Sequence, residues 1–184
     1  MIAVLLAVLS LAAPRAAAPD YSGVYEKGVP FARFLAEATS LKSEWDATFA
    51  GAAIEEASLA RAKGLTGSWR ILVVAEDSCH DSLGTVPYLA KLVEASPDTL
   101  SMRIVRKAVG LSVMEAHRTP DGRAATPTIV ILDSEGGVKG AIAERPAALW
   151  EFSKEHSGRG ERRQWYAEDK GRHAIAEILS LIER

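Results

Sequence analysis

The order of apolar runs and helical stretches constrains the fold of this 184-residue chain more than any other feature. An apolar, β-branched run at 69–75 and a run at 100–105 with alternating apolar residues are separated by a helical pattern, which is the spacing of parallel strands joined by a crossover helix. A third run at 126–132 is followed by a tight turn at 133–137 and a fourth run at 138–142, which predicts an antiparallel hairpin. The sequence therefore predicts an α/β fold, with a mixed β-sheet covered by helices on both faces.

Helical patterns flank this core on both sides. Apolar residues at helical spacing between 30 and 63 predict helices with a break near Gly51, and a last helix is expected over 163–182. Pro87 is expected in the first turns of the helix that follows the first strand, where proline is best tolerated. The predicted organisation has three parts: a signal peptide at 1–18, an N-terminal helical extension at 19–66, and a domain at 67–184 with a C-terminal helix.

Composition excludes several classes of protein. The net charge is −2, which leaves no basic surface of the strength that nucleic-acid binding requires. The chain has one cysteine, so it can form no internal disulfide and no Cys₄ or Cys₂His₂ zinc site. No run of 18 apolar residues occurs, so we expect no membrane span. Apolar residues make up 48% and charged residues 25%, which is typical of a folded globular protein rather than a disordered one.

The N-terminus indicates export. An apolar run from Ile2 to Ala13 precedes the small residues at 16–18, an arrangement typical of a secretory signal peptide. Two features are atypical: no Lys or Arg precedes the run, and Pro19 would follow the cleavage site. The sequence therefore predicts a periplasmic or secreted protein, and the alternative is a cytoplasmic protein in which this run forms a buried helix.

The polar turn after the first strand carries the most informative chemistry. Cys79 is expected just before or at a helix N-terminus, where free backbone N–H groups and the helix dipole favour a thiolate. His80 is adjacent and would help when protonated, whereas the negative charges of Asp77 and Asp81 oppose the thiolate. The alternative interpretation is that Cys79 is a small structural residue of a turn.

Three segments resemble conserved motifs of the thioredoxin superfamily. Residues 73–82, Val-Val-Ala-Glu-Asp-Ser-Cys-His-Asp-Ser, resemble its active-site segment, and more narrowly that of a bacterial group whose site reads A-E-D-W-C-G-D-S or A-E-D-W-C-x-D-C. Residues 126–128, Thr-Pro-Thr, are similar to the cis-proline loop, and residues 144–146, Glu-Arg-Pro, to an E-R-P signature after the last hairpin. The three segments occur in the family's order and on the expected elements.

The resemblance implies a thioredoxin-like fold and a role for each matching residue. Cys79 corresponds to the attacking cysteine, and Ser82 stands where a resolving cysteine would stand. Pro127 corresponds to the cis-proline facing the thiol, and the Thr126 backbone would pair with an extended substrate chain. Ser78 replaces the tryptophan that commonly precedes the attacking cysteine.

Because Ser82 stands in place of the resolving cysteine, the resemblance implies chemistry at the single thiol of Cys79. The implied reaction is a mixed disulfide at Cys79 with a thiol- or disulfide-containing protein or a small thiol, released by an external thiol, with no cofactor and no metal. The alternative is a non-catalytic thioredoxin-fold module for binding or assembly, because one fold hosts many functions. The sequence makes no prediction of oligomeric state.

Other polar residues favour structural interpretations. His117, His156 and His173 lack the spacing of metal ligands, so we expect them at the surface. The arginines at 159, 162 and 163 are interpreted as the solvated start of a helix rather than as an anion site.

Overall fold

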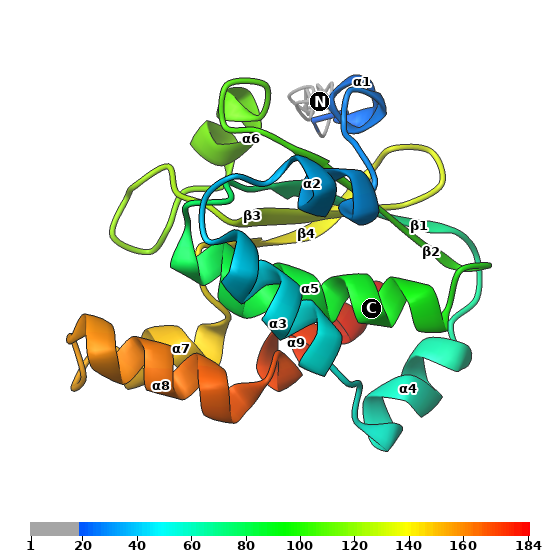
Figure 1. Ribbon diagram of the computed structural model, residues 1–184. Coiled ribbons are helices and arrows are strands. Elements are labelled where there is room, and N and C mark those ends of the chain that lie inside the picture. The colour runs from blue at the N-terminus through cyan, green and yellow to red at the C-terminus, as the bar shows by residue number, and fades with distance from the viewer. Residues whose placement is uncertain (1–18) are drawn as a thin grey trace, which may run out of the picture.

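The computed structural model describes residues 19–184 (Figure 1). The predicted signal peptide at 1–18 lies outside the described residues. Within 19–184 one sheet is present, with the strand order β2-β1-β3-β4. β1 pairs in parallel with β2 and antiparallel with β3, and β3 pairs antiparallel with β4. The strands are β1 Trp69–Val74, β2 Leu100–Val105, β3 Thr128–Leu132 and β4 Val138–Ala143. The predicted mixed sheet, with its crossover and its hairpin, is therefore confirmed.

Helices surround the sheet. They are α1 Ser22–Glu26, α2 Phe31–Glu37, α3 Lys42–Gly51, α4 Glu56–Lys63, α5 His80–Ala95, α6 Leu111–Ala116, α7 Ala147–Phe152, α8 Arg159–Asp169 and α9 Arg172–Ile182. None of these helices is long and apolar enough to span a membrane, a finding that covers residues 19–184.

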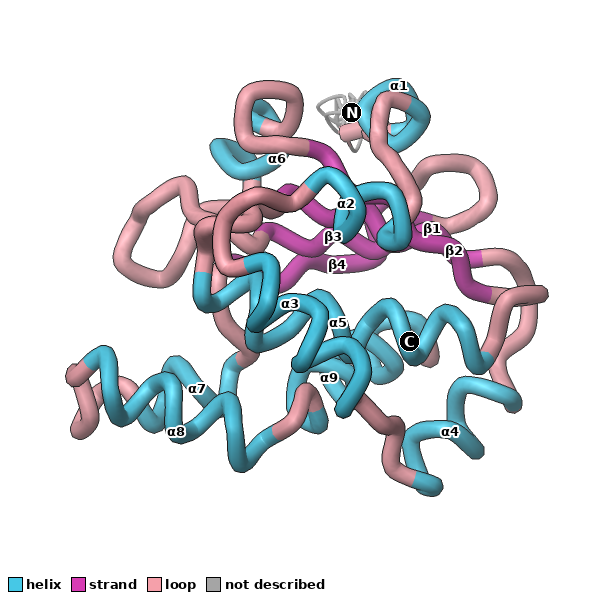
Figure 2. Tube along the Cα trace, in the orientation of Figure 1, coloured by secondary structure: helices cyan, strands magenta, loops and turns pink. Residues whose placement is uncertain are grey.

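Side-chain alternation along the strands divides the core into two layers. Successive residues of a strand point to opposite faces of the sheet. In β1, Ile71 and Val73 pack against α2, α3, α5 and α9, whereas Leu72 and Val74 pack against α1 and α6. Figure 2 shows the strands between these helix groups. Both faces are therefore buried, which explains why β1 and β3 read as continuous apolar runs.

The helices α2, α3 and α4 belong to the larger of these two layers. α3 ends at Gly51 and α4 begins at Glu56, so the predicted break is confirmed. Phe34 and Trp45 are almost fully buried with their ring centroids 5.3 Å apart. Both side chains pack in the same cluster as the α5 and α9 side chains, so residues 19–66 contribute to the core of the sheet domain.

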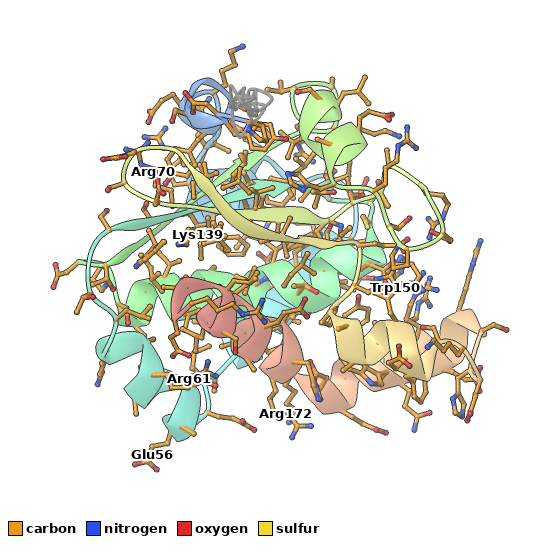
Figure 3. All side chains as sticks on the ribbon, turned by 180° about the vertical axis from the view of Figure 1, so that it is seen from behind. Glu56, Arg61, Arg70, Lys139, Trp150 and Arg172 are labelled. Atoms are coloured by element: carbon orange, nitrogen blue, oxygen red, sulfur yellow. The ribbon has the colours of Figure 1, made fainter. Side chains whose placement is uncertain are left out.

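The C-terminal helix closes this layer. The Arg61 guanidinium of α4 donates two hydrogen bonds to the carboxylate of Glu183 just after α9, with Nη2 to Oε2 at 2.7 Å. Figure 3 labels Arg61 on α4, close to α9. Because both side chains are partly exposed, this pair adds at most about 1 kcal/mol of stability.

The structure corrects two helix predictions. The single helix expected over 163–182 is wrong: α8 and α9 are separated at Lys170 and Gly171, which have φ values of 52° and 77°. A Cβ at Gly171 would collide with Tyr88, so glycine is required at this tight turn. The placement of Pro87 in the first turns of its helix is also wrong. Proline lies inside α5, because this helix begins at His80.

Candidate functional site

Cys79 lies where the loop after β1 enters α5. Its φ and ψ of −91° and 117° are extended, so it forms the N-cap of the helix. The Ser82 backbone N–H donates a hydrogen bond to Cys79 Sγ, with N and Sγ 3.4 Å apart. The predicted position of Cys79 at a helix N-terminus is therefore confirmed. The N–H donor and the positive end of α5 both favour negative charge on the sulfur.

The proline loop lies against this sulfur. The Thr126–Pro127 peptide bond is cis. The Cys79 thiol donates to the Thr126 carbonyl, with Sγ and O 3.1 Å apart. The Glu144 N–H donates to the Pro127 carbonyl at 2.7 Å, which ties the loop to the end of β4. The antiparallel pairing of β1 with β3 brings the two loops together, as the sequence predicts.

The two hydrogen bonds of the sulfur favour different protonation states. The bond from Ser82 N–H stabilises the thiolate, because the sulfur is the acceptor. The bond to the Thr126 carbonyl exists only while the thiol carries its proton. In the thiol form the sulfur makes both hydrogen bonds, and a thiolate would keep only the one from the Ser82 N–H.

Asp77 anchors the cysteine loop to the N-terminal extension. Its Oδ2 accepts hydrogen bonds from the backbone N–H groups of Thr39 at 2.8 Å and Ser40 at 3.0 Å. Its Oδ1 accepts from Arg106 Nη1 at 2.8 Å. Burial raises the pKa of Asp77, but the hydrogen bonds from Ser40, Thr39 and Arg106 outweigh burial and lower it to about 2. Asp77 is thus an ionised structural group.

A buried tryptophan supports the same loop. Trp45 Nε1 donates to the Asp77 carbonyl at 2.9 Å, and its side chain is completely buried. Ser78, which stands where the family commonly has tryptophan, is exposed. The sequence gives no sign of the contact between Trp45 and the cysteine loop, because the two lie 32 positions apart.

Ser82 lies on the buried side of the first turn of α5. Its side chain is completely buried, and its Oγ has no hydrogen-bond partner within residues 19–184. The backbone N–H is the group that contacts Cys79 Sγ. The Ser82 hydroxyl therefore cannot act as a second thiol, and it does not act as a base for the Cys79 thiol.

Asp81 is buried and faces two arginines. Its Oδ1 lies 3.1 Å from Arg162 Nε and 3.8 Å from Arg145 Nε. Burial raises the pKa of Asp81, and the charges of Arg162 and Arg145 act in the opposite direction. The predicted opposition of Asp77 and Asp81 to a thiolate is therefore reduced, because arginines face both carboxylates.

The E-R-P segment connects the proline loop to this cluster. Glu144 accepts two hydrogen bonds from the Arg123 guanidinium, at 3.1 and 2.9 Å. Arg145 lies 3.3 Å from Glu144 and also faces Asp81. Its guanidinium stacks over Trp150, with Cζ 4.6 Å from the ring centroid. The resemblance locates this segment in the sequence. The structure shows that the segment contacts both Arg123, before the proline loop, and Asp81, in the first turn of α5.

The other histidines have local partners. His156 stacks on Phe152, His117 packs against the Tyr21 ring, and His173 contacts Asp169. His173 is exposed, while His117 and His156 are partly buried, so the expectation of surface positions is only partly met. Among residues 19–184, no group of three or more His, Cys, Asp or Glu side chains has the arrangement of a metal site.

Residues missed by the sequence reasoning all come from distant segments. Arg106 reaches the cysteine loop and Tyr166 packs against α5 from elements far along the chain. No local pattern marks these two residues. Arg145 had a signal through the E-R-P segment, and Arg162 was noted only within the arginine cluster interpreted as a solvated helix start, whereas it faces Asp81.

Solved structures share this fold. A protein of unknown function from Pseudomonas aeruginosa, known at 1.5 Å, superimposes with a TM-score of 0.75 and 21% identity, covering 90% of this chain and 98% of that one. An HIV epitope-scaffold superimposes equally well, at 20% identity and the same coverages. At these identities the likeness concerns the fold alone.

Sequence comparison identifies the family. No curated protein matches the chain. The family model described as Thioredoxin matches residues 28–157, which is more than half of the chain and includes the cysteine loop, the proline loop and part of the N-terminal extension. The fold predicted from the three sequence motifs is the fold observed, and the chain belongs to this thioredoxin family.

Proposed function

We propose that this protein exchanges disulfides through the single thiol of Cys79. The observation that carries the proposal is the position of the sulfur at the N-cap of α5, within 3.4 Å of the Ser82 backbone nitrogen. Exchange requires a thiolate, and N–H donation at a helix N-terminus stabilises one. The neighbouring carboxylates do not prevent this, because Asp77 and Asp81 face arginines.

The reaction has two steps. The Cys79 thiolate attacks one sulfur of a disulfide, forms a mixed disulfide and releases the other sulfur as a thiolate, which takes a proton from water. An external thiolate then attacks the mixed disulfide, forms a new disulfide with the substrate sulfur and restores the Cys79 thiolate. Ser82 cannot perform the second step, because a hydroxyl forms no disulfide. The adduct therefore persists until another thiol arrives.

The test is adduct formation measured by intact-protein mass spectrometry. Wild-type protein incubated with glutathione disulfide should gain one glutathione, and Cys79→Ser should gain none. Ser82→Cys should lose the adduct by forming an internal disulfide, and it should gain reduction of insulin disulfides. The proposal is wrong if wild-type protein forms no adduct and Ser82→Cys gains no reductase activity.

A specific observation favours one second candidate, a non-catalytic binding module. The Cys79 thiol donates to the Thr126 carbonyl, a contact that holds the sulfur in its unreactive form. Ultraviolet absorbance of the thiolate, followed while the pH is raised, separates the two. Ionisation below the pH at which free cysteine ionises, about 8.5, supports exchange, and ionisation at or above that pH supports the binding module.

We also propose that the protein is exported to an oxidising compartment, where disulfides are available to it. The basis is the apolar run followed by small residues at 16–18. Mass spectrometry of protein purified from its native host should find a chain that begins near residue 19. Soluble cytoplasmic protein that retains Met1 would refute export.

A further inference from the structure

An arginine-lined cavity adjoins the first turn of α5. Its volume is about 200 Å³, and α5 and α8 form its walls. The residues that line it are His80, Asp81, Arg159, Arg162, Arg163 and Tyr166. His80 follows Cys79 directly in the chain, so one wall of the cavity is formed by the residue next to the cysteine. The interpretation of the arginine cluster as a solvated helix start is therefore incomplete, because these side chains form the wall of a hollow.

The cavity carries an excess of positive charge. Its wall holds three guanidinium groups and one carboxylate, in a chain whose net charge is −2. Arg162 faces Asp81 at 3.1 Å. Arg163 Nη2 donates to His80 Nε2 at 2.8 Å, a contact that satisfies one N–H and leaves the charge of Arg163 uncompensated. Arg159 has neither an ion pair nor a hydrogen bond among the described residues.

Two buried polar atoms belong to residues that line the cavity. The Tyr166 hydroxyl and Asp81 Oδ1 are shielded from solvent, and within 19–184 neither makes a hydrogen bond of good geometry, although Asp81 Oδ1 lies 3.1 Å from Arg162 Nε. Burial and the charge of Asp81 raise the pKa of Tyr166 well above its usual value, so its hydroxyl keeps its proton. Unsatisfied buried polar groups are costly, and a ligand or water in such a cavity relieves that cost.

α8 is held close enough to form this wall because Gly84 has no side chain. A Cβ at Gly84 would lie 2.5 Å from the Tyr166 ring. A neighbouring hollow of about 310 Å³ shares His80, Arg163 and Tyr166 with the cavity. It adds the apolar side chains of Leu83, Tyr88 and Ala167, together with Glu44 and Thr48. The combined surface suits a small molecule with an anionic end and a short hydrocarbon body.

We propose that this cavity selects small anionic thiols and disulfides, specifically those with a carboxylate a few bonds from the sulfur, as substrates of Cys79. The inference rests on the proposed exchange function and names its substrate class. Arg159 and Arg163 bind the carboxylate, which places the sulfur end of the molecule beside the first turn of α5. Guanidinium groups suit this role because their planar N–H donors match a carboxylate.

The first test compares three disulfides of similar size: the dianion dithiodipropionate, neutral hydroxyethyl disulfide and the dication cystamine. The rate of adduct formation at Cys79 should fall in that order, with dithiodipropionate on the order of tenfold faster than the neutral disulfide, at the low end of electrostatic steering. The preference should weaken as salt is added. Equal rates for dithiodipropionate and cystamine would overturn the proposal.

Matched variants locate the preference. The double variant Arg159→Gln and Arg163→Gln should lose most of the preference for dithiodipropionate over hydroxyethyl disulfide. The double lysine variant, which keeps the charge, should retain part of the preference. Arg33→Gln removes an exposed arginine of α2 and should change nothing. Retention of the full preference in the glutamine variant would refute the role of these arginines.

A binding measurement separates this inference from the exchange reaction. Suberate resembles dithiodipropionate with methylenes in place of the sulfurs, and octanediol is its neutral counterpart. Calorimetry on Cys79→Ser protein should detect suberate binding that the glutamine double variant weakens on the order of tenfold, and no binding of octanediol. If suberate binds but no disulfide reacts with wild type, the exchange function is wrong and the anion site stands. If suberate does not bind, the anion site is wrong.

Discussion

The carboxylate of Asp77 should make the stability of the protein depend on acid. A pKa lowered from its usual 3.8 to about 2 corresponds to about 2.5 kcal/mol favouring the ionised form in the folded state, at about 1.36 kcal/mol per pKa unit. Arg106 is 36% exposed, and solvent screens its charge, so we expect a contribution of about 2 kcal/mol. Asp77→Asn keeps the shape of the side chain and removes its charge, so it should cost this amount at neutral pH.

The sign of the pH dependence follows from the direction of the shift. Because the pKa of Asp77 is lower in the folded protein, its contribution is complete above about pH 4 and is lost as the pH falls through about 2. By the linkage relation, roughly half of it remains at pH 3. The difference in unfolding free energy between wild type and Asp77→Asn should therefore shrink between pH 5 and pH 3.

Urea unfolding at several pH values measures this difference. Asp46→Asn is the matched control, because the contact of Asp46 with Lys42 lies at the surface, and it should change stability by less than about 0.5 kcal/mol. Hydrogen exchange adds a local readout, since the amides of Thr39 and Ser40 lose their carboxylate acceptor in Asp77→Asn. A variant as stable as wild type at pH 7, or a difference that stays constant down to pH 3, would refute the reasoning.

Two further substitutions test the packing around the site by urea unfolding. Trp45→Phe keeps an aromatic side chain but leaves the Asp77 carbonyl without its donor, so it should lower the free energy of unfolding by about 1–2 kcal/mol. An unchanged free energy of unfolding would mean that water replaces the indole N–H. Gly84→Ala should cost about 1–3 kcal/mol, because the new methyl meets Tyr166. The control is Gly160→Ala, because a Cβ at Gly160 has no neighbouring atom within 4 Å, and this variant should stabilise α8 by up to about 1 kcal/mol. Equal effects of the two substitutions on stability would contradict the close contact of α5 and α8.

The sheet and the position of Cys79 could be predicted because their signals are local. The run at 69–75 is apolar at successive positions, which suits a strand buried on both faces, and a polar turn follows it directly. The N-cap at Cys79 is likewise formed within four residues, by the Ser82 N–H. Both signals lie within a few consecutive residues, although the strand is buried by distant segments of the chain.

The break between α8 and α9 could not be read from periodicity alone. The apolar stripe of Ile175, Ile178, Leu179 and Ile182 is regular, and it says nothing about where its helix begins. The turn at Lys170 and Gly171 is imposed by packing, since Tyr88 occupies the space that a side chain at Gly171 would need. Only the folded structure shows that Gly171 lies in a turn and is not a glycine inside a continuous helix.

The sign of the electric field at the cysteine depends on tertiary structure for the same reason. Near Cys79 the sequence supplies two carboxylates, Asp77 and Asp81, and on that basis the site would repel a thiolate and an anionic substrate alike. In the folded chain Arg106 binds the first carboxylate, and Arg162 faces the second from α8. The acids that seem to oppose the chemistry instead hold guanidinium groups beside the first turn of α5. Each of the two acids is therefore paired with an arginine, and the excess of positive charge near the first turn of α5 comes from Arg159 and Arg163.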